Sequence, residues 1–244
     1  MNYKAILQYE GTRYRGWQTQ GNTENTIQGK LEALLTKMAE EPVEVNGSGR
    51  TDAGVHAAGQ VISFRCKTEK TPEEICQYMN EYLPEDIAIL SVEEAAPRFH
   101  ARLNAVRKTY VYRIWNAPVR NVFRRRFTTW IQKPLDLNAM EQAAALLCGT
   151  HDYRAFCSLK KFKKSTVRTI EKIEIGKMGQ EIRISYTGDG FLYHMVRILT
   201  GTLVEVGLGL RKPEEMTEIL EGQDRAKAGR LMPPEGLTLE SVEY

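Results

Sequence analysis

The sequence predicts an α+β protein made of two similar units, and this expectation rests on its length and on the order of its predicted elements. The chain has 244 residues, 42% of them hydrophobic, which suffices for one large core or two ordinary ones. Over residues 3–92 the predicted elements follow the order β-α-β-β-α-β, which is that of the split βαβ or ferredoxin-like unit. Such a unit forms a four-stranded antiparallel sheet with both helices on one face.

In the first half, short runs of alternating apolar residues predict strands at residues 3–10, 43–47, 60–66 and 87–92. Apolar residues at helical spacing predict a helix over 26–39, with Asn25 or Thr26 as its N-cap. The stretch Thr71-Pro72-Glu73-Glu74 has the pattern of a capping box with proline at the first helical position, so a second helix should begin there. The first domain is therefore expected to cover residues 1–103.

The second half repeats this order approximately, with an added strand and helix, although no sequence repeat is visible. The predicted strands lie at residues 108–116, 127–132, 167–175, 181–186 and 237–242, and the predicted helices at 136–148, 191–206 and 213–221. A second domain of the same ferredoxin-like or RRM-like type is expected over residues 104–244. If the two sheets join edge to edge, they form a mixed, mainly antiparallel sheet with the helices on one face and a central cleft across the open face.

Basic residues are concentrated in two segments, although the formal net charge of the chain is only +3. Residues 98–133 contain ten Lys or Arg and residues 154–168 contain six, and neither segment contains Asp or Glu. A charge run alone is usually solvated surface, but these runs are interleaved with aromatic residues, as is typical of surfaces that bind phosphates and stack bases. We therefore expect a nucleic acid in the central cleft, which the family resemblance described below implies to be RNA. The residues expected to contact its backbone are Arg124, Arg125, Arg126, Lys160, Lys161, Lys163 and Lys164.

The sequence predicts a cytoplasmic protein that has no metal site. The first ten residues lack a basic region followed by an apolar run, and no stretch approaches the roughly 18 apolar residues of a membrane span. The cysteines, at positions 66, 76, 148 and 157, form no C-x-x-C pair, and the four histidines form no H-x-x-x-H pattern. We expect reduced, mostly packed cysteines, no zinc and no membrane association.

The stretch from Gly47 to Gln60 surrounds one carboxylate, Asp52, with glycines. It also contains Arg50 and His56. Because glycine lets a partner approach the main chain closely, this loop is suited to present Asp52 to a ligand. The alternative is an ordinary turn in which the Asp side chain caps its own backbone. A dinucleotide site is disfavoured, because no helix opens directly after the glycines.

A second feature is an arginine in the middle of the predicted helix over 191–206. His194, Arg197 and Gly201 share one face of this helix, apart from the apolar stripe that includes Leu192. An arginine in apolar surroundings favours a carboxylate partner, which its planar group can hold in a fixed orientation. The alternative is that the Arg197 side chain merely reaches the surface.

Three motifs of the sequence resemble those of one enzyme family. They are Gly49-Arg50-Thr51-Asp52-Ala53-Gly54-Val55-His56, Lys108-Thr109-Tyr110-Val111-Tyr112-Arg113 and Gly190-Phe191-Leu192-Tyr193-His194-Met195-Val196-Arg197. In combination they resemble the motifs of the tRNA pseudouridine synthase A (TruA) family. The resemblance spans nearly the whole chain.

The resemblance implies an isomerase that converts uridine to pseudouridine in the anticodon stem-loop of tRNA, at positions 38, 39 and 40. It implies that Asp52 is the catalytic residue, that Tyr110 stacks on the target base and that Arg197 forms a salt bridge to Asp52. The substrate-binding residues expected with it are Arg50, Tyr110, Leu192 and His56. The family also implies a homodimer, tRNA as the partner and no cofactor.

The chemistry of this reaction fits a single carboxylate. The N1–C1′ bond breaks, the uracil rotates and C5 bonds to C1′, so no redox step or energy input is needed. The base must first leave its stack, at a cost of a few kcal/mol that stacking on Tyr110, worth about 1–3 kcal/mol, would offset. Asp52 must stay ionised to attack C1′ or C6 or to take a proton from C2′, and the sequence leaves these three roles open. Burial favours the neutral acid, whereas Arg197 nearby would favour the ionised one.

Two other readings of the sequence are a non-catalytic RNA-binding protein and a hydrolase. A non-catalytic protein built on RRM-like units would need an RNP1-like run of exposed aromatic residues, and no such run is present. A phosphoester hydrolase that uses Asp52 would usually need a cluster of metal-binding carboxylates, whereas the loop offers one acid. Tritium release from C5-labelled uridine in a tRNA transcript separates these readings.

Overall fold

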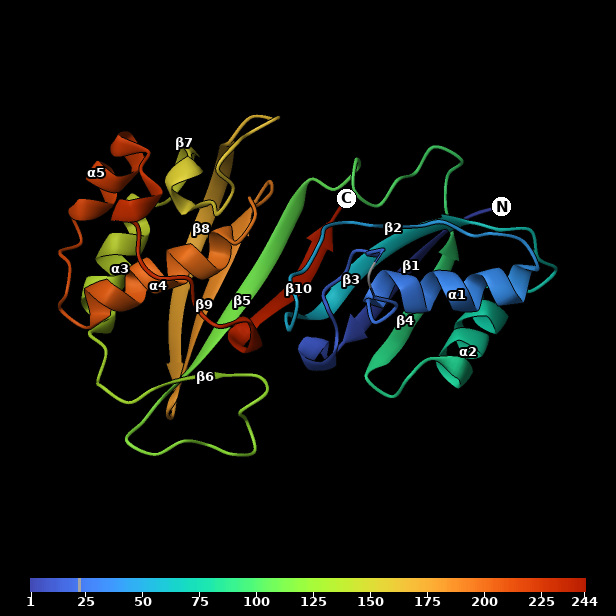
Figure 1. The fold of residues 1–244 in the computed structure, drawn as a ribbon, viewed down its shortest axis with the longest axis horizontal. Helices are drawn as coiled ribbons and strands as arrows, with labels where there is room; N and C mark the ends of the chain where they lie inside the picture. Colours follow the sequence, from blue (N-terminus) through green and yellow to red (C-terminus); the bar gives the residue numbers. More distant parts are fainter. Residues whose placement is uncertain (22) are drawn as a thin grey trace. The chain divides into compact units, whose positions relative to one another are not determined.

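The computed structural model describes residues 1–21 and 23–244 and divides into two compact units (Figure 1). Unit 1 comprises Met1–Val106 and Thr238–Tyr244, and unit 2 comprises Arg107–Leu237. The sequence predicts that the last strand belongs to the second domain, but in the structure Thr238–Tyr244 lies with unit 1. The division of the chain into two domains near residue 103 stays a prediction.

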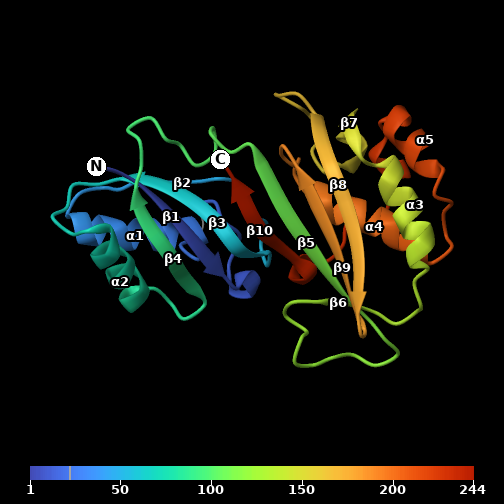
Figure 2. The same ribbon diagram turned by 180° about the vertical axis from the view of Figure 1, so that it is seen from behind.

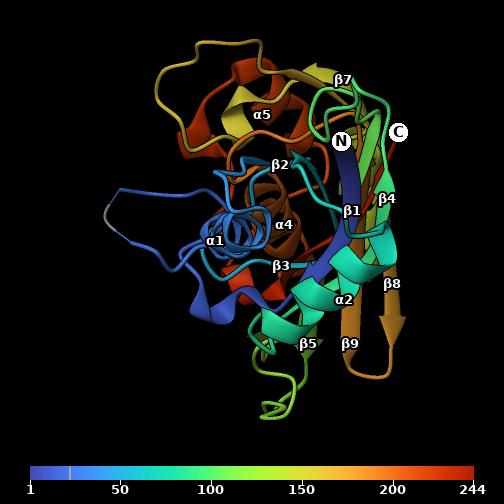
Figure 3. The same cartoon turned by 90° about the vertical axis from the view of Figure 1, so that its right-hand side faces the viewer.

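Unit 1 has the β-α-β-β-α-β order that the sequence predicts. The elements are β1 (Asn2–Tyr9), α1 (Ile27–Ala39), β2 (Val45–Gly47), β3 (His56–Arg65), α2 (Pro72–Tyr82) and β4 (Ile87–Glu94), with a short 3-10 helix, η1 (Gly11–Arg13), after β1. β1 pairs antiparallel with both β3 and β4, and β2 pairs antiparallel with β3. Within this unit, α1 and α2 lie on one face of the strands (Figures 1 and 3). The α+β class is thereby confirmed.

The edge of β3 that faces away from β1 is shared by two strands. β2 pairs with the end of β3, whereas β10 (Leu237–Glu243) pairs in parallel with its beginning, where Thr238 lies opposite His56. A Cβ atom at Gly59 would come within 2.5 Å of the Glu240 carbonyl oxygen, so glycine permits this close approach of β10. The sequence predicts that β3 begins only at residue 60. Pairing with β1 and β10 extends it back to His56.

Local sequence signals set the helix starts in unit 1. The Thr26 hydroxyl accepts a hydrogen bond from the backbone N–H of Gly29 at 3.2 Å. The Glu74 N–H donates to the Thr71 hydroxyl at 3.3 Å, and the Thr71 N–H donates to the Glu74 carboxylate at 2.7 Å, which confirms the predicted capping box. Both helices bury an apolar face in the core, through Leu31, Leu35, Ile75 and Met79.

Unit 2 is a mainly antiparallel sheet with helices packed on it. Its adjacent strands are, in order, β5 (Arg107–Asn116), β9 (Glu181–Gly188), β8 (Val167–Met178) and β7 (Gly149–Asp152), and β6 (Thr129–Ile131) adds to β5 in parallel. The helices are α3 (Leu137–Leu146), α4 (Met195–Gly207) and α5 (Glu215–Gly222), and the 3-10 helices are η2 (Arg154–Phe156), η3 (Arg225–Lys227) and η4 (Pro234–Gly236). Figure 2 shows β5, β9 and β8 in front of α4. The order β5-β9-β8 is that of the first, third and second strands of a ferredoxin-like unit.

Three tyrosines contribute large, fully buried rings to the core of unit 2: Tyr112, Tyr153 and Tyr186. The Tyr112 hydroxyl lies 2.6 Å from the Thr129 hydroxyl, and the Tyr186 hydroxyl lies 2.8 Å from the Thr200 hydroxyl. Burial raises the pKa of all three phenols, so they stay neutral and available as hydrogen-bond donors.

α4 is buried almost all round, which is the expected position for a helix with so few polar residues. The sequence predicts that it begins at Phe191, but it begins at Met195. His194 has a φ of 66°, in the left-handed region, and therefore cannot continue a right-handed helix backwards. The residues before it form a turn that is closed by a hydrogen bond from the Met195 N–H to the Leu192 carbonyl at 3.0 Å.

Candidate active site

Asp52 lies at the start of a tight turn that leads into β3. The Val55 N–H donates to the Asp52 carbonyl at 3.1 Å, and Gly54 has a φ of 80°, as the third residue of a type II turn requires. The neighbours Thr51 and Val55 are buried, whereas Asp52 itself is partly exposed. The turn therefore fixes the backbone on both sides of a carboxylate that solvent can reach.

The residue before Asp52 is held by the first strand and by the loop that follows η1. The Tyr9 hydroxyl lies 2.8 Å from the Thr51 hydroxyl, and the Trp17 N–H donates to the Thr51 carbonyl at 3.0 Å. Burial raises the pKa of Tyr9 to about 12, so this hydroxyl keeps its proton at neutral pH. Gly16, with a φ of 95°, lets the loop approach, because a Cβ atom there would lie 2.9 Å from the Thr51 carbonyl oxygen.

A buried glutamine of β3, Gln60, holds the glycine-rich part of the loop. Its amide oxygen accepts a hydrogen bond from the Ser48 hydroxyl at 2.6 Å, and its amide nitrogen donates to the Gly49 carbonyl at 3.0 Å. Gln60 is not among the site residues that the sequence predicts. The signal that would have found it is an amide at the start of a strand whose other residues are mainly apolar.

The other two predicted site residues of this loop differ in exposure. Arg50 is exposed, whereas the His56 ring is 2% exposed, and its Nδ1 atom accepts a hydrogen bond from the Gly11 N–H at 3.0 Å. The His56 ring thereby holds η1 against the loop. That Arg50 and His56 bind the substrate stays a prediction.

In unit 2, Tyr110 lies on β5 and is almost buried, with 8% of its surface exposed. The Tyr110 and Phe191 rings are in contact edge to face, with centroids 5.2 Å apart and an interplanar angle of 83°. Leu192, the next residue of the turn before α4, is partly exposed. The turn between β9 and α4 therefore places the Phe191 ring against the predicted stacking tyrosine.

Arg197 lies inside unit 2 with 8% of its surface exposed, so its side chain does not simply reach the surface. Its Nε atom donates a hydrogen bond to the Met232 carbonyl at 2.7 Å, and the Met232 N–H donates to the Arg197 carbonyl at 3.3 Å. Met232 thus holds the guanidinium by one hydrogen bond and the Arg197 backbone by another. Met232 is not among the site residues that the sequence predicts.

Two facing glycines allow the segment of residues 229–232 to lie against α4. A Cβ atom at Gly201 would come within 1.9 Å of the Arg230 carbonyl oxygen, and one at Gly229 within 2.5 Å of the Thr202 backbone nitrogen. The Gly229 N–H also donates to the Thr202 hydroxyl at 2.9 Å. A glycine in the middle of a helix was the available sequence signal for this contact.

The predicted site residues fall into two sets, one in each unit. Unit 1 holds Arg50, Asp52 and His56, and unit 2 holds Tyr110, Leu192 and Arg197. The groups present are a carboxylate on a fixed turn, an aromatic ring beside apolar side chains, and a buried guanidinium. Covalent or acid–base chemistry on an extruded base needs groups of these kinds.

The basic residues predicted to contact RNA are not equivalent. Arg124 donates to the buried carboxylate of Glu181 at 2.5 Å, and Arg183 donates to the same carboxylate at 2.6 Å. Arg124 thus ties its loop to β9. Arg124 is itself exposed, as are the other residues of the set, Arg125, Arg126, Lys160, Lys161, Lys163 and Lys164. Contact of any of them with RNA stays a prediction.

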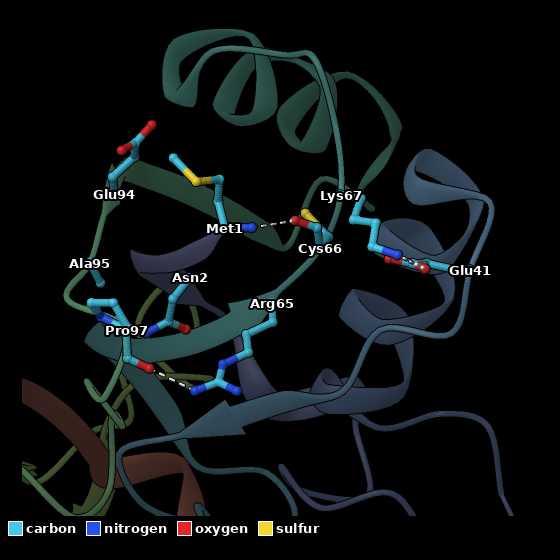
Figure 4. A pocket seen from close by; sticks show the side chains of 9 residues that line it. All are labelled: Met1, Asn2, Glu41, Arg65, Cys66, Lys67, Glu94, Ala95 and Pro97. Carbon is cyan, nitrogen blue, oxygen red and sulfur yellow. Dashed lines mark hydrogen bonds and ion pairs between the residues drawn. The ribbon is translucent and has the colours of Figure 1, made fainter.

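A pocket of about 580 Å³ lies elsewhere in unit 1 and contains none of the predicted site residues (Figure 4). It is lined by Met1, Asn2, Glu41, Arg65, Cys66, Lys67, Glu94, Ala95 and Pro97. Its charged groups mostly bond to one another or to the backbone: the Arg65 guanidinium donates to the Pro97 carbonyl at 2.6 Å, and Lys67 lies 4.0 Å from Glu41.

Among residues 1–21 and 23–244, no group of three His, Cys, Asp or Glu side chains is arranged to hold a metal ion. The cysteines at positions 66, 76, 148 and 157 are all free thiols. Of the helices in the described part of the chain, none is long and apolar enough to cross a membrane.

Comparison with known proteins identifies the family. The model of a family described as tRNA pseudouridine synthase matches residues 5–104 and 143–244. The tRNA pseudouridine synthase A of Bacillus sp. (strain KSM-64) is 47% identical over 243 residues, which are 100% of this chain and 99% of that protein. The tRNA pseudouridine synthase A 2 of Clostridium tetani (strain Massachusetts / E88) is 43% identical over 244 residues, which are 100% of this chain and 98% of that protein.

Among solved structures, a chain of a Cbf5-Nop10-Gar1 complex is similar over 84% of this chain and 44% of that chain, with 12% identity and a TM-score of 0.38. This likeness is too weak to support an inference. The full-length relatives and the family model confirm the resemblance that the three sequence motifs predict, and the chain belongs to the tRNA pseudouridine synthase A family of isomerases.

Proposed function

We propose that this isomerase acts on the anticodon stem-loop of tRNA, at uridines 38, 39 and 40, and that Asp52 is its catalytic residue. The observation that carries the proposal is the position of Asp52. It is a partly exposed carboxylate on a turn whose neighbours Thr51 and Val55 are buried. A catalytic group is effective when the surrounding structure holds it in one geometry, and this turn has that property.

The target uridine leaves the base stack and enters the site, where the Tyr110 ring stacks on it. Tyr110 is supported by its contact with Phe191, and Leu192 supplies an apolar wall. The N1–C1′ bond breaks, the uracil rotates, and C5 bonds to C1′. The C5 hydrogen leaves as a proton and N1 gains one, so the reaction is balanced without a cofactor.

Asp52 assists this exchange as a carboxylate in one of three ways: it attacks C1′, attacks C6, or takes a proton from C2′. Arg197 forms a salt bridge to Asp52, as the family resemblance implies, and its planar group holds the carboxylate in a fixed orientation. Support for this pairing comes from the burial of Arg197 and from the fixed orientation that the Met232 carbonyl gives its guanidinium. Arg50 holds the extruded nucleotide, with His56 in the same loop.

The central test is the variant Asp52→Asn, assayed by tritium release from C5-labelled uridine in a tRNA transcript. We expect no measurable turnover and a tRNA Kd close to that of the wild type, because the substitution removes the charge and keeps the shape. The matched control is Asp136→Asn, since Asp136 caps α3 through its side chain and asparagine caps equally well. If Asp52→Asn turns over within about tenfold of the wild-type rate, the activation free energy has risen by no more than about 1.4 kcal/mol. Such a result would refute the catalytic assignment.

The substrate positions are tested with three transcripts, each labelled at only one of the uridines 38, 39 and 40. Tritium release from all three supports the proposed range, and release from none of them, with release from uridines elsewhere, rejects it.

The pairing of Asp52 with Arg197 is tested by a double-mutant cycle on the free energy of unfolding, with Asp52→Asn and Arg197→Gln alone and together. Groups in contact show coupling energies of about 0.5–3 kcal/mol, whereas distant groups are additive within about 0.3–0.5 kcal/mol. Additive effects would show that the two charges do not interact.

RNA backbone contacts are tested through the salt dependence of tRNA binding. Each lost phosphate contact should reduce the slope of log K against log salt by about 0.7–0.9. We expect this reduction for Lys161→Glu and Lys163→Glu, and an unchanged slope for Lys177→Glu, an exposed lysine of β8 outside the basic segment. Equal slopes in all variants would exclude the segment from the RNA interface.

We also infer that the enzyme is a cytoplasmic homodimer and that one tRNA contacts both copies, as the family resemblance implies. Sedimentation of the full chain with and without tRNA tests the assembly. A chain that sediments as a monomer under conditions of full activity would reject it.

A further inference from the structure

The turn between β9 and α4 contains a residue in an unusual backbone conformation. His194 has a φ of 66°, which is uncommon for a residue with a side chain and costs on the order of 1 kcal/mol. Its carbonyl accepts the first hydrogen bond of α4, from the Ile198 N–H at 3.0 Å. Strained residues of this kind persist where the surrounding structure holds them, and they cluster at functional sites.

This conformation brings two aromatic rings together at the surface of unit 2. The Tyr193 and His194 rings are stacked, with centroids 3.7 Å apart and an interplanar angle of 27°. Tyr193 is 49% exposed. The pair is fixed from the neighbouring loop, where the Ser158 hydroxyl lies 2.8 Å from His194 Nδ1 and the Ser158 N–H donates to the Tyr193 carbonyl at 3.3 Å.

The loop that supports this pair carries strong positive charge. Residues 154–168 contain six Lys or Arg and no Asp or Glu. Two acids on adjoining elements are engaged by neighbours: the Asp189 carboxylate accepts a hydrogen bond from the Thr169 N–H at 3.0 Å, and Asp152 pairs with Arg154 at 2.8 Å. The surroundings of the ring pair therefore suit a polyanion.

We propose that Tyr193 and His194 form a second base-stacking site, which binds the nucleotide next to the extruded uridine. Aromatic side chains, including histidine, stack on unpaired RNA bases, and such stacking is tolerant of base identity. The inference rests on the proposed function, since extrusion of the uridine deprives the neighbouring base of its own stacking partner. Phe191, in the same turn as Tyr193 and His194, contacts the Tyr110 ring on β5, so this turn adjoins the first stacking residue as well.

The test uses the full chain and a tRNA transcript that carries 2-aminopurine next to the target uridine. Its fluorescence reports the stacking of that base. We expect Tyr193→Ala to abolish the fluorescence change on binding and to weaken the Kd about fivefold or more, whereas Tyr193→Phe retains both. The matched control is Tyr82→Ala, because Tyr82 in α2 is 55% exposed and also contacts another aromatic ring, that of Tyr78.

The outcomes separate this inference from the function on which it rests. A fluorescence change and a Kd that are the same in Tyr193→Ala and the wild type overturn the second stacking site. A loss of similar size in Tyr82→Ala overturns it as well, because the effect would then not depend on the ring pair. Tritium release by the wild-type chain is measured on the same transcript, and only its absence counts against the proposed isomerisation.

Discussion

Replacing Gly201 with alanine should displace the segment that holds Arg197. The new Cβ atom would lie 1.9 Å from the Arg230 carbonyl oxygen, which must retreat by about 1.1 Å to reach even 3.0 Å. This segment also carries Gly229, bonded to the Thr202 hydroxyl at 2.9 Å, and Met232, whose carbonyl accepts from Arg197 at 2.7 Å. The substitution therefore acts on the guanidinium from a position that does not touch it.

The magnitude of the effect combines three contributions. Forcing an extra carbon into a packed interior costs about 1–3 kcal/mol, and losing the hydrogen bond to Thr202 adds about 0.5–1.5 kcal/mol. The higher helix propensity of alanine offsets about 0.8–1 kcal/mol. We expect a net loss of about 0.5–3.7 kcal/mol in the free energy of unfolding. Because a displacement of about 1 Å can lower a rate about 100-fold, we expect turnover to fall by more than the lost stability alone implies.

The assay is urea unfolding together with tritium release under conditions where each variant is folded. The matched control is Gly222→Ala, at the end of α5, where a Cβ atom would meet nothing within 4 Å. This control should keep full turnover and gain up to about 1 kcal/mol of stability. If Gly201→Ala stays within about 0.5 kcal/mol of the wild type, the range of ordinary surface changes, and keeps full turnover, the segment does not hold Arg197 in place.

Three further predictions concern single interactions. Glu181→Gln removes the buried charge that two arginines share, and it should lower the free energy of unfolding by about 1.5–3 kcal/mol in urea titrations; an unchanged midpoint would contradict this. Partial burial acts to raise the pKa of Asp152, but hydrogen bonds from Thr166 and Arg154 outweigh it and lower the pKa below 3.8. A carboxyl whose pKa is lowered on folding stabilises the fold at pH values above its unfolded pKa, and this stability is lost as the pH falls below 3.8. The melting temperature of the wild type should therefore fall more steeply with decreasing pH than that of Asp152→Asn. Equal pH dependence of the melting temperature in both proteins would contradict this. Thr71→Ala breaks the capping box and should cost about 1 kcal/mol, whereas Thr71→Ser should restore most of it.

Elements with local signals could be predicted from the sequence. The capping box at Thr71 and the N-cap at Thr26 fix helix starts through contacts three residues away, so they are visible in the sequence itself. Asp52 could also be singled out from the sequence as a candidate site residue, because a single acid among glycines is a local pattern and the family resemblance covers it.

Features that depend on distant partners could not be predicted. The first residues of β3, His56 to Gly59, have little strand propensity and are extended because β1 and β10 pair with them. The helical spacing of apolar residues extends back to Phe191 and therefore predicts too early a start for α4. The helix begins only at Met195, because the His194 backbone is in the left-handed region. The carbonyl that orients Arg197 belongs to Met232, and no sequence pattern connects two such residues.

The pairing of β10 with β3 has a consequence for synthesis of the protein. About 180 residues separate His56 from its partner Thr238, and a ribosome that adds about 5–20 residues per second needs roughly 10–35 s for them. Throughout this interval the beginning of β3 presents an unpaired strand edge, which is a site for wrong association with other chains. We expect the nascent chain to depend on chaperones, and the turn that carries Asp52 to mature only after translation has passed through unit 2.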